Sequence, residues 1–100
     1  MSLRRQVTCG VITRIEPKQL HILVTAETDH EGRHYVTLLQ VGFTNYRLTI
    51  GDTLSWSTIY NGVFSSVMWW RGGGPHGRVC KLWLLGIESQ TIIPSKDREQ

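Results

Sequence analysis

Apolar and polar residues alternate with a period of two through most of this chain, and short turn signals interrupt the alternation. It runs through residues 7–15, 20–26 and 34–41, with turn-forming residues such as Pro17 and Gly32 between these stretches. A period of two is that of a β-strand, whose successive side chains point to opposite faces. No stretch has the 3.6-residue period of an amphipathic helix. The sequence therefore predicts a nearly all-β protein.

The second half of the chain continues the same pattern after a connector at residues 42–50. Gly51-Asp52 is a turn signal, and alternating stretches follow at 53–60 and 63–70. Asn61-Gly62 between them is typical of a tight hairpin, because both central positions of a type I′ turn favour positive φ. A last strand is expected at 78–87.

One domain accounts for the whole length of 100 residues, of which 40% are hydrophobic and 19% charged. We expect a flexible N-terminal arm at 1–6, a barrel at 7–93 and a polar tail at 94–100. Short strands joined by tight turns must hide their edges, and a small closed barrel does so. The expected fold is an antiparallel barrel of five to six strands, an OB-fold first and an SH3-like barrel as the alternative.

Two stretches resemble the OB-fold of cold-shock and S1-type domains. These are Val-Thr-Cys-Gly-Val-Ile-Thr-Arg-Ile at 7–15 and Leu-Thr-Ile-Gly-Asp-Thr-Leu-Ser-Trp at 48–56. In that family such phrases mark the first and fourth strands. The stretch Leu-His-Ile-Leu-Val at 20–24 lacks the family's phenylalanine pair. The resemblance therefore implies the fold and assigns no binding residue.

The composition also indicates a compartment. No apolar run approaches the ~20 residues that cross a bilayer, and no apolar segment of a signal peptide follows the start Met-Ser-Leu-Arg-Arg. We expect a cytoplasmic protein without a membrane partner. Cys9 and Cys80 show no zinc-binding spacing and are expected to be buried free thiols.

The most informative segment for function is 67–78, Val-Met-Trp-Trp-Arg-Gly-Gly-Gly-Pro-His-Gly-Arg. A half-exposed strand buries only one of two adjacent side chains, so either Trp69 or Trp70 should face outward. An outward indole beside Arg71 and Arg78 suits base stacking and phosphate contacts in a single strand. Two other interpretations remain open: a tryptophan that covers the core, and an anchor in a protein interface.

Further candidates come from the face and loops that an OB-fold uses for its ligand. The net charge of +3 is compatible with a polyanion, although Glu27, Asp29 and Glu31 in the same region would repel phosphate. The complete expected nucleic-acid site consists of Trp69, Trp70, Arg71, His76, Arg78, Arg14, Lys18, His21, Arg33, His34 and Tyr35.

The sequence offers little for catalysis or metal binding. His30 and His34 are four apart, a spacing that converges on a helix but not across a hairpin turn. The glycine loop lacks the Lys-Ser/Thr of a P-loop, and no nucleophile elbow or HExxH motif occurs. We expect a protein that is not an enzyme and has no metal or cofactor. Its expected partner is single-stranded DNA or RNA, and the alternative is a protein or a second copy that covers the same aromatic patch.

Overall fold

The computed structural model describes residues 5–59, 66–72 and 79–94, and within these ranges every regular element is a strand. The strands are β1 (Arg5–Pro17), β2 (Ile22–His30), β3 (Arg33–Val41), β4 (Thr53–Ile59), β5 (Ser66–Trp70) and β6 (Cys80–Pro94). The described part of the chain has no helix long and apolar enough to cross a membrane. The predicted Asn61-Gly62 hairpin lies outside the described residues.

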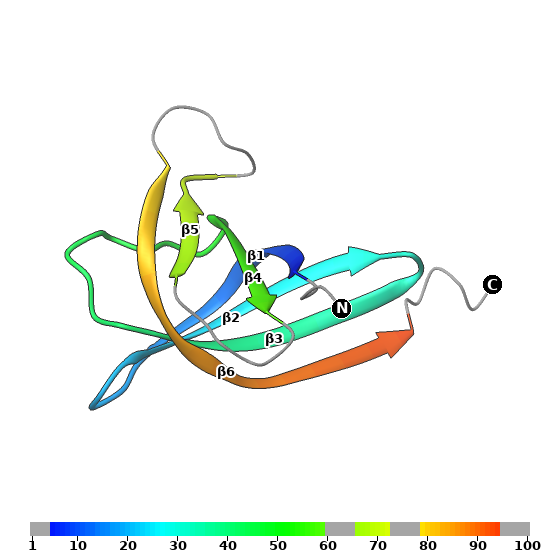
Figure 1. Cartoon of the computed structure of the whole chain (residues 1–100), viewed down its shortest axis with the longest axis horizontal. Coiled ribbons are helices and arrows are strands. Elements are labelled where there is room, and N and C mark those ends of the chain that lie inside the picture. Colours follow the sequence, from blue (N-terminus) through cyan, green and yellow to red (C-terminus); the bar gives the residue numbers. More distant parts are fainter. Residues whose placement is uncertain (1–4, 60–65, 73–78, 95–100) are drawn as a thin grey trace.

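The six strands close into a barrel in the order β1-β2-β3-β6-β5-β4 (Figure 1). Every pairing is antiparallel. β1 closes the barrel because its first half pairs with β4 and its second half with β2. This arrangement confirms the predicted class, an all-β antiparallel barrel, and is compatible with an OB-like fold.

The barrel is filled by the inward-facing residues of all its strands. Ile12, Val24, Leu39 and Leu54 have no exposed surface, and both β5 and β6 add further apolar side chains to the same cluster. On β3 and β4 the buried residues fall on the face that the alternation indicates. The remaining members are Ala26, Val41, Trp56, Val67, Trp69, Cys80, Leu82 and Leu84.

On β1 the buried residues do not follow one simple alternation. Ile12 is fully buried, whereas Cys9 and Val11 are exposed. The pairing with β2 shifts register between Ile12 and Arg14. This irregularity lets Ile12 and Ile15 both contact the core, although the two residues differ by three positions. The expectation of a buried thiol is therefore confirmed for Cys80 and overturned for Cys9.

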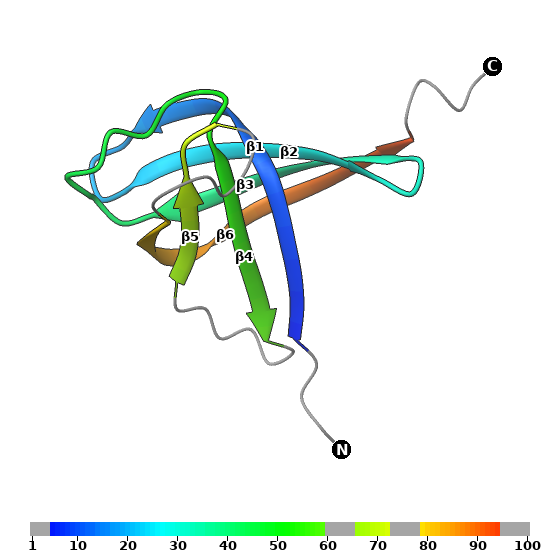
Figure 2. The ribbon, with the colours of Figure 1, turned by 90° about the horizontal axis from the view of Figure 1, so that it is seen from above.

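Strands β2, β3 and β6 continue past the barrel as a three-stranded arm. We define the arm as residues 27–38 of the β2–β3 hairpin and 89–94 of β6 (Figures 1 and 2). Its tip is the two-residue turn Glu31-Gly32, with φ of 52° and 76°, as a type I′ hairpin requires. β2 and β3 thus extend closer to the tip than the predicted stretches 20–26 and 34–41. β6 reaches seven residues beyond its predicted end at 87.

Candidate functional site

The connector between β3 and β4, residues 42–52, is held at the end of the barrel by the buried carboxylate of Asp52. Its Oδ2 accepts hydrogen bonds from the backbone N–H of Thr49 and from Nε1 of Trp69, both at 3.0 Å. Its Oδ1 accepts the backbone N–H of Gly72 at 3.1 Å. One side chain therefore joins the connector to the core and to the end of β5.

Arg71 reinforces this junction from the outside. Its guanidinium lies over the Trp69 ring, 5.2 Å from the centroid. It also donates to Thr49 Oγ1 at 2.8 Å and to the carbonyl oxygen of Arg47 at 3.1 Å, and it lies 3.7 Å from Asp52. The expected phosphate-binding arginine thus also has a structural task, although its side chain is 57% exposed.

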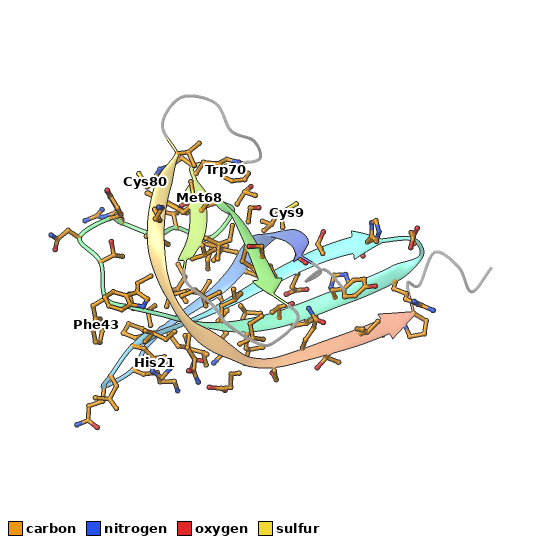
Figure 3. All side chains as sticks on the ribbon, viewed as in Figure 1. Cys9, His21, Phe43, Met68, Trp70 and Cys80 are labelled. Carbon is orange, nitrogen blue, oxygen red and sulfur yellow. The ribbon has the colours of Figure 1, made fainter. Side chains whose placement is uncertain are left out.

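The side chains of the two adjacent tryptophans on β5 point to opposite faces of the strand, as alternation requires. Trp69 points inward and is 6% exposed, with Tyr46 at 5.5 Å between ring centroids. It offers no free face to a base. Trp70 lies on the outer side at the end of β5 (Figure 3) and is half-buried. Its Nε1 is buried without a hydrogen-bond partner among the residues that the structure describes.

Among the described residues, the most exposed aromatic side chains belong to β6 and the connector. Trp83 is 70% exposed and Phe43 is 61% exposed. Gly42 joins their two segments: its N–H donates to the carbonyl of Trp83 at 2.8 Å, and a Cβ there would lie 3.3 Å from the Trp83 Cβ. Leu85, 47% exposed, follows Trp83 on the same face of β6. We call Phe43, Trp83 and Leu85 the aromatic surface.

The aromatic surface lies on the side of the molecule away from the arm, as the position of Phe43 in Figure 3 shows. Phe43 to Tyr46 line an open hollow beside it. The charged residues in the described segments 42–52 and 79–87 are Arg47, Asp52 and Lys81. Because Asp52 is buried, the exposed charges of these segments are both positive.

Sequence reasoning missed this surface, although the signal was present. Leu82 and Leu84 are both buried, so alternation alone places Trp83 on the outer face. The sequence-based prediction placed the outward-facing indole at Trp69 or Trp70 instead.

One of the other predicted binding residues lies near the aromatic surface: His21 directly precedes Ile22, the partner of Val41, and Figure 3 shows it at the same end of the molecule as Phe43. Arg14 and Lys18 lie near Glu16, at 3.3 and 3.9 Å, at the turn that joins β1 to β2. His21 belongs to the same turn, and its Nε2 is buried without a partner in the described ranges. Arg33, His34 and Tyr35 lie on the arm, and His76 and Arg78 fall outside the described residues.

His34 forms a clasp with two carboxylates on the arm. Its Nδ1 lies 2.7 Å from Asp29 Oδ1, and its Nε2 lies 2.7 Å from Glu27 Oε1. Thr13 Oγ1 donates to the other oxygen of Glu27 at 2.6 Å. The hydrogen bonds to Asp29 and Glu27 raise the pKa of His34 above its usual 6.5. The hydrogen bonds from Thr13 and His34 lower the pKa of Glu27 below 4.5.

Both ring nitrogens can donate only when the imidazole is protonated, so the clasp favours a charged His34. Within the clasp, Glu27 and Asp29 are the hydrogen-bond partners of His34. The clasp therefore offers no basic surface for phosphate. No cluster of three metal-ligating side chains suited to a metal ion occurs in the described ranges.

Comparison of the chain with protein-family models, with characterised proteins and with solved structures gave no match. Function is therefore inferred from the site alone.

Proposed function

We propose that this protein binds single-stranded nucleic acid on the aromatic surface. The observation that carries the proposal is the exposure of Trp83 and Phe43, two aromatic residues whose segments are joined by the hydrogen bond from Gly42 to Trp83. A large ring left in water is explained by a ligand that covers it. Bases stack on such rings whatever their identity, and each stack contributes about 1–3 kcal/mol.

Charge supports a nucleic-acid ligand at this end of the molecule. Lys81 lies two residues before Trp83 on the same face of β6, and Arg47 lies on the connector. Both are exposed and have no ion-pair partner in the described part of the chain. Two cations beside two rings suit a short strand whose bases stack while its phosphates contact the basic groups.

A relationship with cold-shock and S1-type OB-fold proteins belongs to the same proposal. It is supported by the closed barrel, in which β1 pairs on both sides, and by the strand that begins after Gly51-Asp52. The proposed surface lies on β6 and the connector. The outer face of β2 and β3, which the OB-fold analogy favours, carries the acidic clasp instead.

The proposal is tested by titrating fluorescein-labelled oligo-dT and oligo-U with the protein and recording anisotropy at increasing salt. If Lys81 and Arg47 neutralise two phosphates, the plot of log K against log salt has a slope of roughly −1.4. Trp83→Ala and Phe43→Ala should weaken binding. The matched control is Leu20→Ala, which truncates a more exposed apolar residue, at 83%, in the β1–β2 turn. Absence of binding at low salt, or equal loss in the control, contradicts the proposal.

A protein partner is the second candidate, because Leu85 extends the two rings into an apolar strip. Trp and Arg are enriched in protein interfaces, and an apolar neighbour such as Leu85 adds nothing to phosphate recognition. Substituting Leu85→Ser separates the candidates. Binding of oligonucleotide should change little, whereas affinity for a protein partner should fall together with that of Trp83→Ala.

A further inference from the structure

Beyond Trp83, strand β6 has a described strand on only one of its two edges. β5 pairs with Cys80–Trp83 and no further. β3 pairs with β6 from Leu84 to Pro94 on the other edge. Figures 1 and 2 show this part of β6 leaving the barrel along the arm. Its outer backbone N–H and C=O groups therefore face no other strand of the described chain.

The outer edge of β6 is irregular near the barrel and regular towards the end of the strand. Register shifts opposite Leu38/Leu39 and Gln40/Val41 place extra residues of β6 at Leu85 and Glu88. Such bulges twist an edge and discourage pairing. From Ser89 to Pro94 the register is regular, opposite Leu38 to Arg33.

The regular stretch lacks the devices that protect natural sheet edges. Residues 89–93, Ser-Gln-Thr-Ile-Ile, contain no charge and no proline, and proline appears only at 94. All of them are exposed, and Ile92 and Ile93, on opposite faces, are 51% and 46% exposed. A neutral edge that is rich in β-branched residues is a template for another extended strand.

We propose that residues 89–93 of β6 pair antiparallel with the same residues of a second copy, around a two-fold axis. Self-pairing is favoured because it brings no like charges together: with the axis at Thr91, Ser89 faces Ile93 of the other copy. It also directs Glu88 of one copy towards the end of β6 in the other, where Arg33 pairs with Pro94. Glu88 of β6 in one copy and Arg33 of β3 in the other thus bring opposite charges towards each other under the two-fold rotation.

The two arms then form one continuous sheet, and the aromatic surfaces remain free because they lie on the far side of each barrel. A contact of five residues per copy is small beside the roughly 1,200–2,000 Å² buried in a stable interface. The dimer is therefore weak, and its population depends on protein concentration.

The test is sedimentation equilibrium of the whole chain from low micromolar to near-millimolar concentration. The wild type should pass from monomer to dimer over this range. The double variant S89K/T91K places like charges on the edge and should stay monomeric throughout. The matched control V11K adds a lysine at an exposed position of β1, which is paired on both sides, and should dimerise as the wild type does.

Hydrogen exchange of the same samples locates the contact. Amides in 89–93 that point away from β3 should become protected only as the concentration rises. A wild-type monomer at near-millimolar concentration overturns the proposal, as does a dimer that S89K/T91K leaves intact. Loss of the dimer in Trp83→Ala but not in S89K/T91K also overturns it, because self-association would then use the aromatic surface.

Discussion

Two carboxylate networks in this barrel use similar chemistry with opposite exposure. At the barrel end, the Asp52 side chain is 3% exposed and accepts three neutral N–H donors. On the arm, Glu27 and Asp29 hold His34 between them, with side chains 31%, 73% and 32% exposed. Burial makes the first network a fixed joint, because the carboxylate and the Trp69 indole N–H are both shielded from water. Because the second network is exposed, the charges of His34 and Glu27 can change with pH.

The difference explains why the molecule is asymmetric in charge. Asp52 holds the connector and Trp69, so its negative charge is buried, and the exposed charges in this region include those of Arg47, Arg71 and Lys81. The arm keeps its acids at the surface and neutralises part of them with His34. The exposed charges of the connector and of the start of β6 are therefore positive, whereas the arm carries Glu27, Asp29 and Glu31 beside Arg33 and His34.

Removing the buried carboxylate should have the largest effect. Asp52→Ala leaves the Trp69 indole N–H and two backbone N–H groups without an acceptor. The buried indole N–H costs about 1–3 kcal/mol without an acceptor and the two part-buried backbone groups cost less, so the free energy of unfolding should fall by roughly 2 kcal/mol or more. Urea unfolding at neutral pH measures it. Asp52→Asn keeps an acceptor oxygen and should lose less. If the free energy of unfolding of Asp52→Ala falls by less than about 1 kcal/mol, the Asp52 carboxylate does not stabilise the connector.

The aromatic surface should be important for affinity and unimportant for stability. Trp83→Ala removes one stacking platform, which corresponds to about 1–3 kcal/mol, or roughly a 5- to 150-fold weaker complex with oligo-dT. Because the ring is exposed, the urea midpoint should hardly move. Anisotropy titration and urea unfolding of the same sample separate the two effects. If Trp83→Ala folds and binds oligo-dT with wild-type affinity, the aromatic surface is not the binding site.

Much of the fold could be predicted from the sequence because its information is local. Alternation at 33–41 and 53–59 indicates both the strands and their buried faces. The strand β1 was predicted, but its buried face was not, because the register shift after Ile12 changes the inward face and no residue type in this stretch indicates the shift. The end of β6 was not predicted, because Glu-Ser-Gln-Thr is exposed on both faces, so the burial pattern that marks a strand is absent.

The site was predictable in part. The outward position of Trp83 follows from its neighbours in β6. The Asp52 joint does not, because its partners Trp69 and Gly72 are 17 and 20 residues away in the chain. The clasp depends on the position of one turn: with Glu31-Gly32 as the two-residue loop, Asp29 lies directly opposite His34. Placing that turn correctly would have revealed the pair.

The clasp should have the smallest effect, and pH should reveal it. His34 has a raised pKa, so its contribution is fully present below its usual pKa of 6.5 and is lost as pH rises through the raised value. Glu27 has a lowered pKa, so its contribution is present above 4.5 and is lost as pH falls through the lowered value. The clasp is thus strongest between these two usual values. Exposed ion pairs of this kind contribute up to about 1 kcal/mol.

Thermal unfolding of wild type and His34→Gln from pH 4 to 9 measures this contribution. The difference in stability between them should be greatest near pH 5.5 and shrink towards alkaline pH. Binding of oligonucleotide by His34→Gln should equal that of the wild type at the same pH. A difference that grows with rising pH would contradict the charged clasp.

Contact between Trp83 and the ligand can be measured by iodide quenching of tryptophan fluorescence with and without saturating oligo-dT. Trp56 and Trp69 are buried and Trp70 is half-buried, so Trp83 should dominate the iodide-accessible emission. We expect oligo-dT to abolish most of that accessible fraction in the wild type, and Trp83→Phe to lack it from the start. An accessible fraction that stays unchanged when oligo-dT is bound would contradict the account.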